Sequence, residues 1–76
     1  MLNILRKMEV KLNGEQKTLV QEEMPLEDFL KELGLDPEMP GVAVAINWEV
    51  IPRGSWSETT VRDGDEIELI TARQGG

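Results

Sequence analysis

The stretch that decides the fold is MEVKLNGEQKTLV, residues 8–20. Within residues 8–12 the apolar side chains fall on even positions and the charged ones on odd positions, which is the period of a strand with one buried face. Asn13-Gly14 follows, the pair that best tolerates the positive φ angles of a two-residue type I′ turn. Residues 16–20 then resume an extended pattern. The stretch therefore predicts a β-hairpin.

A short amphipathic helix is predicted after the hairpin. Pro25 suits a first helical turn, and the apolar side chains that follow it recur with the i, i+3, i+4, i+7 spacing of one helix face. These apolar residues are Leu26, Phe29, Leu30 and Leu33, and the acidic residues placed near the positive end of the helix dipole are Glu22, Glu23, Glu27 and Asp28. Gly34, followed by Leu35 and Pro37, gives the left-handed stop, the hydrophobic contact and the breaker expected at the carboxyl end. Residues 36–41 are then expected to form a loop.

Short extended segments follow the helix. Residues 42–46 are apolar at every position, which indicates a strand whose one face is buried by the helix. Residues 47–49 are predicted to turn into a second short strand at residues 50–51. Residues 54–57 are compatible with a short helical turn, after which the chain crosses toward its last strand.

The last strand is predicted at residues 66–71, after the turn at residues 63–65. Ile67 and Leu69 are expected on one face and Ile70 on the other, because side chains alternate along a strand. The order of elements is hairpin, helix, strand, irregular crossing, strand. A right-handed crossover places the later strands beside the first, so the predicted class is α+β with a β-grasp, ubiquitin-like fold. We expect a mixed sheet of about four to five strands with one main helix on one face.

The composition favours one small acidic domain spanning residues 1–76. The chain has 8 basic and 15 acidic side chains, for a formal net charge of −7. Residues 1–20 carry +2 and residues 21–76 carry −9, a distribution that can steer a basic partner toward the later part of the chain. A phosphate backbone or an anionic membrane surface would be repelled, so we expect neither nucleic acid nor a membrane as partner.

Cysteine and histidine do not occur in the sequence. Thiol nucleophiles, imidazole bases and Cys/His metal sites are therefore excluded, and side-chain catalysis is not expected. Turn formation suffices to explain Asp63-Gly64-Asp65, which lacks the ligand run of an EF-hand, so no metal site is predicted. No apolar run approaches the roughly 20 residues of a membrane span, and the first residues lack the features of a secretory signal. The expected location is the cytoplasm.

The sequence ends in Gly75-Gly76. Two residues without Cβ form the thinnest backbone available and adopt any φ and ψ, so they can thread a narrow channel and present the terminal carboxylate to a partner. A carboxylate becomes an electrophile only when one oxygen is made a leaving group, so a carrier of this kind would be activated at Gly76 by a nucleotide-using partner. The competing interpretation is an idle flexible terminus, because residues 72–76 lack periodicity and are expected to form a mobile tail.

Five segments together suggest a family. They are VAVAIN at 42–47, EVIPR at 49–53, Trp56, DGDEIEL at 63–69 and QGG at 74–76. In this order they resemble the ThiS family, the ubiquitin-like sulfur carriers of thiamine biosynthesis, and LNGE at 12–15 with the leucine-rich helix matches that family more loosely. The tail lacks the proline of the related molybdopterin-synthase small subunits. The sequence departs from the family pattern at residues 1–7, a possible N-terminal extension, and at Trp48, where a turn usually has a small or polar residue.

The resemblance implies a protein co-substrate rather than an enzyme. Gly76 would be adenylated with ATP by a ThiF-like adenylyltransferase and converted to a thiocarboxylate with sulfur from a sulfur-donating enzyme. The sulfur would pass to a ThiG-like thiazole synthase. The partner's channel would bind the tail residues Gly75, Gln74 and Arg73, with Arg73 pairing with acidic groups that line the channel. No cofactor would be bound stably, since ATP is used by the activating partner.

A shallow apolar surface beside the tail is the expected docking site. Its candidate residues are Ile70, Ala43 and Ala45, and Trp48 is a further candidate because aromatic residues are enriched in interface hot spots. Trp56 is expected to fill the core instead. Two alternatives remain open at this point: a β-grasp interaction module whose glycine tail is incidental, and a sulfur carrier for molybdopterin, transfer-RNA thiolation or protein conjugation.

Overall fold

The predicted hairpin is present in the computed structural model, which describes residues 7–72. Strand β1 (Met8–Leu12) pairs antiparallel with β2 (Glu15–Leu19), so that Met8 lies opposite Leu19. Asn13 has φ 51° and Gly14 φ 87°, the two left-handed positions that a type I′ turn requires. The one-residue alternation is also confirmed, because Met8 and Val10 are buried while Glu9 and Lys11 are exposed.

The helix α1 (Leu26–Glu32) begins one residue later than the sequence suggests. Pro25 is its N-cap, with ψ 146°, and not its first helical residue. Glu23 lies in a short strand before the helix, β3 (Glu23–Pro25), and the acidic residues of the first helical turn are Glu27 and Asp28. The carboxyl end is as predicted: Gly34 has φ 84° and donates its N–H to Lys31, while Leu35 donates to Leu30 across the turn.

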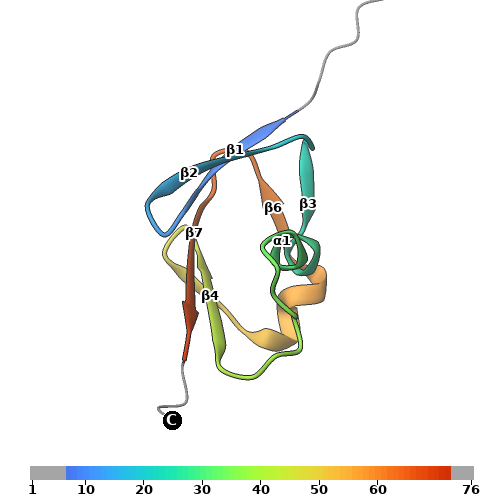
Figure 1. The fold of residues 1–76 in the computed structure, drawn as a ribbon, viewed down its shortest axis with the longest axis vertical. Coiled ribbons are helices and arrows are strands. Elements are labelled where there is room, and N and C mark those ends of the chain that lie inside the picture. Colours follow the sequence, from blue (N-terminus) through green and yellow to red (C-terminus); the bar gives the residue numbers. More distant parts are fainter. Residues whose placement is uncertain (1–6, 73–76) are drawn as a thin grey trace, which may run out of the picture.

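The main sheet has five strands in the order β2-β1-β7-β4-β5. Strands β4 (Val42–Ile46) and β5 (Glu49–Ile51) form the second hairpin, and β7 (Glu66–Thr71) inserts between the two hairpins. It runs parallel to β1 and antiparallel to β4, which completes the mixed sheet (Figure 1). The last strand in sequence is therefore the central strand of the sheet.

A second, two-stranded sheet was not predicted. It pairs β3 with β6 (Thr60–Arg62), and the 3-10 helix η1 (Arg53–Glu58) leads into it. Arg62 and Glu23 form an ion pair across this sheet at 3.2 Å between Nε and Oε1, with both side chains more than half exposed. Together with α1 these elements lie on one side of the main sheet (Figure 1).

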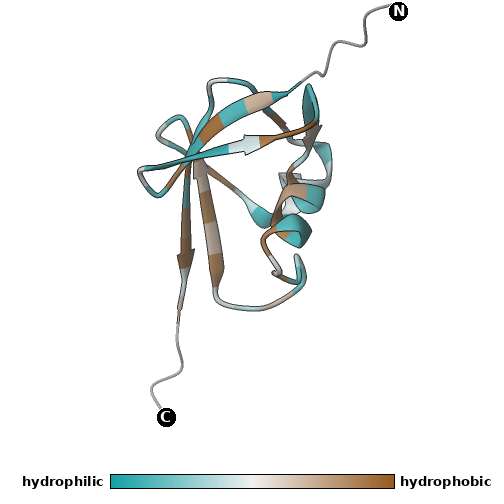
Figure 2. Cartoon of the chain, turned by 45° about the horizontal axis from the view of Figure 1, so that its top comes forward, coloured by the Kyte–Doolittle hydropathy of each residue, from teal (hydrophilic) through white to brown (hydrophobic). Residues whose placement is uncertain are grey.

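The core lies between the main sheet and α1, η1 and the small sheet. Its buried side chains come from every layer: Met8, Val10, Met24, Leu26, Phe29, Leu30, Val44, Ile46, Trp56, Val61 and Ile67. Trp56 is 1% exposed and donates Nε1–H to the carbonyl of Ile51 at 2.9 Å, so its predicted place in the core is confirmed. Figure 2 shows β4 as brown or pale brown along its length, whereas the turns are mostly teal. Neither helix in residues 7–72 has the length and hydrophobicity that crossing a membrane requires.

Candidate functional site

The chain leaves the sheet beside the start of β4. Thr71 is opposite Val42, and the final hydrogen bond of this strand pair runs from the N–H of Ala72 to the carbonyl of Gly41 at 2.6 Å. We call the Gly41–Ala72 contact the tail root. The predicted tail residues Arg73, Gln74, Gly75 and Gly76 lie outside the described residues, as do residues 1–6 of the possible N-terminal extension.

Next to the tail root, the sheet face turned away from the core carries small and apolar side chains beside the exposed Glu68. Ile70 is 63% exposed and lies opposite Ala43, while Ala45 lies opposite Glu68 on the same face. The structure thus brings together three of the predicted docking residues. It adds a fourth that the sequence did not single out, Val50, which is 71% exposed and lies opposite Ala45. Ile70, Ala43, Ala45 and Val50 are called the outer patch below.

Trp48 lies away from the tail root. It sits in the turn between β4 and β5, with φ 71° and 77% of its surface exposed. This turn is at the opposite end of β4 from Gly41, a separation of about 16 Å for a five-residue strand. The Cβ of a tryptophan makes a left-handed backbone unfavourable. Contacts made by neighbouring residues must therefore offset the strain in this turn.

Asn47 makes three hydrogen bonds that stabilise this turn. Its N–H donates to the carbonyl of Glu66 at 2.7 Å and its Oδ1 accepts the N–H of Glu66 at 3.0 Å. Its Nδ2 donates to Oδ1 of Asp65 at 3.0 Å. The β4–β5 turn is thereby fastened to the first residue of β7, and the strain at Trp48 is offset by three hydrogen bonds from its neighbour.

The aspartate carboxylates of the turn before β7 accept hydrogen bonds from main-chain N–H groups. Oδ1 of Asp63 accepts the N–H of Glu9 at 2.8 Å, and Oδ2 of Asp65 accepts the N–H of Arg62 at 2.8 Å. Both carboxylates fasten the turn to the sheet. No group of three or more metal-ligating side chains is found in the stretch from residue 7 to residue 72.

Arg53 is engaged within the chain. Its guanidinium donates to the carbonyls of Pro37, Met39 and Val42, the second at 2.6 Å and the third at 3.4 Å. Its carbon Cζ lies 4.4 Å from the centre of the Trp56 ring. Arg53 therefore holds the loop that precedes β4. Its guanidinium also stacks on the buried Trp56 ring, which connects this loop to the core.

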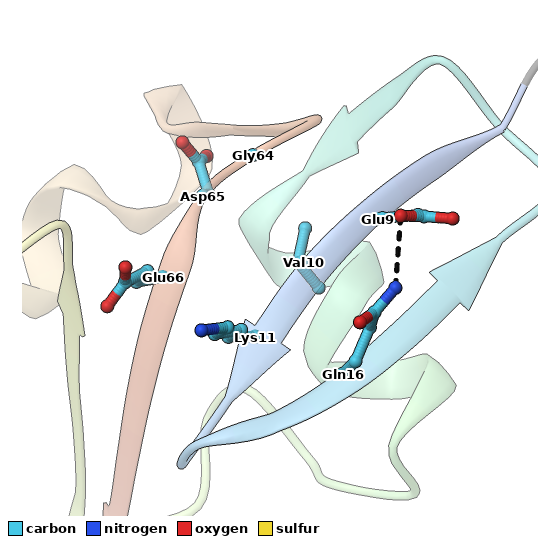
Figure 3. Close-up of a pocket in the computed structure, with 7 residues that line it drawn as sticks. All are labelled: Glu9, Val10, Lys11, Gln16, Gly64, Asp65 and Glu66. Atoms are coloured by element: carbon cyan, nitrogen blue, oxygen red, sulfur yellow. Dashed lines mark hydrogen bonds between the residues drawn. The ribbon is translucent and has the colours of Figure 1, made fainter.

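A polar hollow lies at the other end of the sheet. It has a volume of about 190 Å³ and is lined by Glu9, Val10, Lys11, Gln16, Gly64, Asp65 and Glu66 (Figure 3). Gln16 donates Nε2–H to Glu9 at 3.0 Å across β1 and β2. The hollow is at the start of β7, whereas the tail root follows its end, so it is separate from the candidate site.

Comparison with known proteins gives the same family as the sequence motifs. The model of the ThiS family matches residues 9–76. The chain is 39% identical over 65 residues to the sulfur carrier protein ThiS of Thermus thermophilus, an alignment covering 86% of this chain and 95% of that protein. It is 43% identical over 42 residues to the sulfur carrier protein ThiS of Escherichia coli, covering 55% of this chain and 64% of that one.

A third relative is much larger than this chain. It is a thiazole synthase from Paramagnetospirillum magneticum, 36% identical over 69 residues, which are 91% of this chain and 20% of the synthase. This chain therefore spans only a fifth of that protein, and just under two thirds of the Escherichia coli relative.

Solved structures support the fold. The crystal structure of ThiS from Geobacter metallireducens matches with a TM-score of 0.77 at 31% identity, covering 91% of this chain and 100% of that one. The solution structure of a thiamine biosynthesis protein from the same organism gives a TM-score of 0.76 over 91% of this chain and 88% of that one. With the five-stranded mixed sheet and its helix, these similarities confirm the predicted β-grasp fold.

Proposed function

Because the chain belongs to the ThiS family, we propose that it is a sulfur carrier whose reactive group is the carboxylate of Gly76. The observation that carries this proposal is the family match, which extends to the terminal glycine pair at residues 75 and 76. Cysteine and histidine do not occur in the sequence, and a carboxylate at the main-chain terminus supports acyl chemistry without them. The chain acts as a co-substrate and its partners supply the catalytic side chains.

The reaction proceeds in two steps on the partner. The Gly76 carboxylate attacks the α-phosphorus of ATP in a ThiF-like adenylyltransferase, and pyrophosphate leaves. Hydrosulfide supplied by a sulfur-donating enzyme then attacks the acyl carbon, the bond from that carbon to the AMP oxygen breaks, AMP leaves, and the product is a thiocarboxylate. Adenylation makes the second step feasible because AMP is a far better leaving group than the original carboxylate oxygen.

The geometry near the tail root suits this role. Residues 73–76 span at most about 14 Å when fully extended, so the carboxylate stays near the body of the protein during activation. The outer patch adjoins the tail root, because Ile70 lies two residues before Ala72. We propose that a ThiF-like partner docks on the outer patch while its channel receives the tail.

The acceptor that we propose is a ThiG-like thiazole synthase. The Paramagnetospirillum thiazole synthase includes a region of 69 residues similar to this chain, so a carrier-like segment and a thiazole synthase occur there in one polypeptide. Joining two proteins raises their effective concentration, which is useful when one delivers a group to the other. This favours thiazole synthesis over molybdopterin or transfer-RNA thiolation as the destination of the sulfur.

The test is intact-protein mass spectrometry after incubation with ATP, a ThiF-like adenylyltransferase and a sulfur donor. We expect a mass increase equal to the replacement of one oxygen by sulfur, localised to Gly76. A variant lacking Gly76 and a variant extended by one residue are the controls, and both should remain unmodified. An unchanged wild-type mass, with an adenylyltransferase that activates another carrier in parallel, would refute the proposal. Transfer to thiazole synthase is then measured as thiazole formation.

A further inference from the structure

Gly41 combines two constraints at the tail root. Its φ is 81°, in the left-handed region that side chains with a Cβ avoid. Its carbonyl accepts the N–H of Ala72 at 2.6 Å. A Cβ built on Gly41 would lie 3.3 Å from the carbonyl oxygen of Ala72 and 3.5 Å from its Cβ. Any side chain at this position would therefore press on the residue where the chain leaves the sheet.

Three other glycines in the described chain share only the first constraint. Gly14, Gly34 and Gly64 have φ of 87°, 84° and 88°, and a Cβ built on any of them meets nothing within 4 Å. At these three positions glycine is favoured by the left-handed φ alone, since no neighbouring atom would contact a side chain. Gly41 satisfies the same angle and also leaves room for Ala72.

The loop carrying Gly41 is fixed from its other side. Arg53 binds the carbonyls of Met39 and Val42, which flank Gly41 in sequence. The guanidinium in turn stacks on Trp56, which is 1% exposed and therefore part of the rigid core. Because Gly41 is held in this way, a new contact at the tail root displaces Ala72 rather than the loop.

We propose that Gly41 is a positioning residue that sets the direction in which the chain leaves the sheet toward Gly76, with Arg53 holding the loop in place. This inference rests on the proposed function. Residues 73–76 span at most about 14 Å, so they have little slack with which to absorb a redirected start. A partner that binds the outer patch and the tail together gains the avidity of both contacts only when the geometry allows both at once.

The test compares Gly41→Ala with Gly34→Ala as a matched control. Both substitutions place an alanine at nearly the same left-handed φ, and only the first contacts Ala72. The readout is kcat/KM for ATP-dependent pyrophosphate release by a ThiF-like adenylyltransferase, with the folded fraction of each variant checked by circular dichroism. We expect Gly34→Ala to match the wild type and Gly41→Ala to lose about tenfold or more, since small misplacements are costly in group transfer. Equal kcat/KM for the two folded variants would overturn the inference.

A second measurement separates this inference from the proposed function. Amide hydrogen exchange at Ala72, followed by NMR on the chain alone, reports the tail root without any partner. We expect faster exchange at Ala72 in Gly41→Ala than in Gly34→Ala, and unchanged exchange would overturn the inference even if adenylation is observed. A wild-type chain that is never adenylated would refute the proposed function, whatever the exchange result.

Arg53→Lys is a second variant that perturbs the tail root, because Arg53 holds the loop that carries Gly41. Lysine keeps the positive charge and loses the planar fork that binds several carbonyls at once. With this variant we expect faster exchange at Ala72 and a lower kcat/KM, in the same direction as Gly41→Ala but smaller. If Gly41→Ala fails to fold, unchanged exchange and unchanged kcat/KM in Arg53→Lys would overturn the inference.

Discussion

Replacing Ile70 by alanine tests whether the outer patch is the docking surface. Ile70 is 63% exposed, lies opposite the small side chain of Ala43, and shares its face of β7 with the exposed Glu68. Truncation therefore removes apolar surface that a partner would cover and opens no cavity in the core. The expected effect is on binding, with a smaller effect on folding.

The size of the effect follows from the exposed fraction. Full burial of an isoleucine side chain contributes roughly 1.5–3 kcal/mol, and about two thirds of that remains available at a residue that is 63% exposed. Alanine keeps its Cβ, so the expected loss is about 1 kcal/mol of binding free energy. At about 1.4 kcal/mol for each factor of ten, the affinity should fall about fivefold.

The assay is the KM of the chain in pyrophosphate release by a ThiF-like adenylyltransferase, at saturating ATP. Val20→Ala is the matched control, because Val20 is 68% exposed and follows β2 at the opposite end of the sheet from Ala72. We expect about a fivefold higher KM for Ile70→Ala and the wild-type value for Val20→Ala. Urea unfolding of both variants confirms that they are folded under the conditions of the assay.

Equal KM values for these two variants would show that the outer patch makes no contact with the partner. Trp48→Ala then becomes informative, because Trp48 lies at the other end of β4 from the tail root. A raised KM for Trp48→Ala alone would place the docking surface at the β4–β5 turn.

Two further predictions concern stability, measured by urea unfolding. Asn13→Gly keeps an easy left-handed backbone and removes the hydrogen bonds of Asn13 to the N–H and carbonyl of Leu69, at 2.8 and 3.2 Å. We expect a loss of about 1–2 kcal/mol, and about 1 kcal/mol more for Asn13→Ala because of the φ of 51°; a glycine variant as stable as wild type contradicts this. Trp56→Phe leaves the carbonyl of Ile51 without its indole donor and creates a void, for an expected loss of about 2–3 kcal/mol, which a change below about 0.5 kcal/mol would contradict.

Elements with several agreeing local signals could be predicted from the sequence. The first hairpin has alternating polarity on either side of an Asn-Gly turn, and the end of the helix has Gly34 followed by Leu35 and a breaker. The alternation along β7 was equally readable: Ile67 is buried and Ile70 is exposed, as predicted. These features depend on neighbours in sequence, which is why a single sequence reveals them.

The small sheet had no such signal. Strands β3 and β6 have three residues each and a single buried side chain each, Met24 and Val61, so there is no period to read. The acidic residue and the proline of β3 are also typical of the start of a helix, which explains why the sequence gives no sign of a strand at Glu23. Tertiary pairing with a segment 35 or more residues away decided the structure there.

The candidate site is predictable only in part. Ile70 and Ala43 follow from alternation, whereas Val50 joins them through the β4–β5 register, which the sequence does not specify. The contacts of Arg53 connect it to carbonyls 11 to 16 residues away, and the loop that provides them is irregular. The second role of Gly41, room for Ala72, likewise depends on a strand pairing across the chain.

The central place of β7 has a consequence for how the protein is made. Pairs such as Lys11 with Glu66 join residues far apart in the chain, and contacts of that kind slow folding. During synthesis the β1–β2 and β4–β5 hairpins emerge from the ribosome before the strand that joins them. Until residues 66–71 are available, the β1 and β4 edges that β7 will cover stay unpaired, and unpaired edges invite association with other chains. The strand that leads to the tail is thus also the strand that ends this exposure, so nascent chains halted before residue 66 should be the most prone to aggregate.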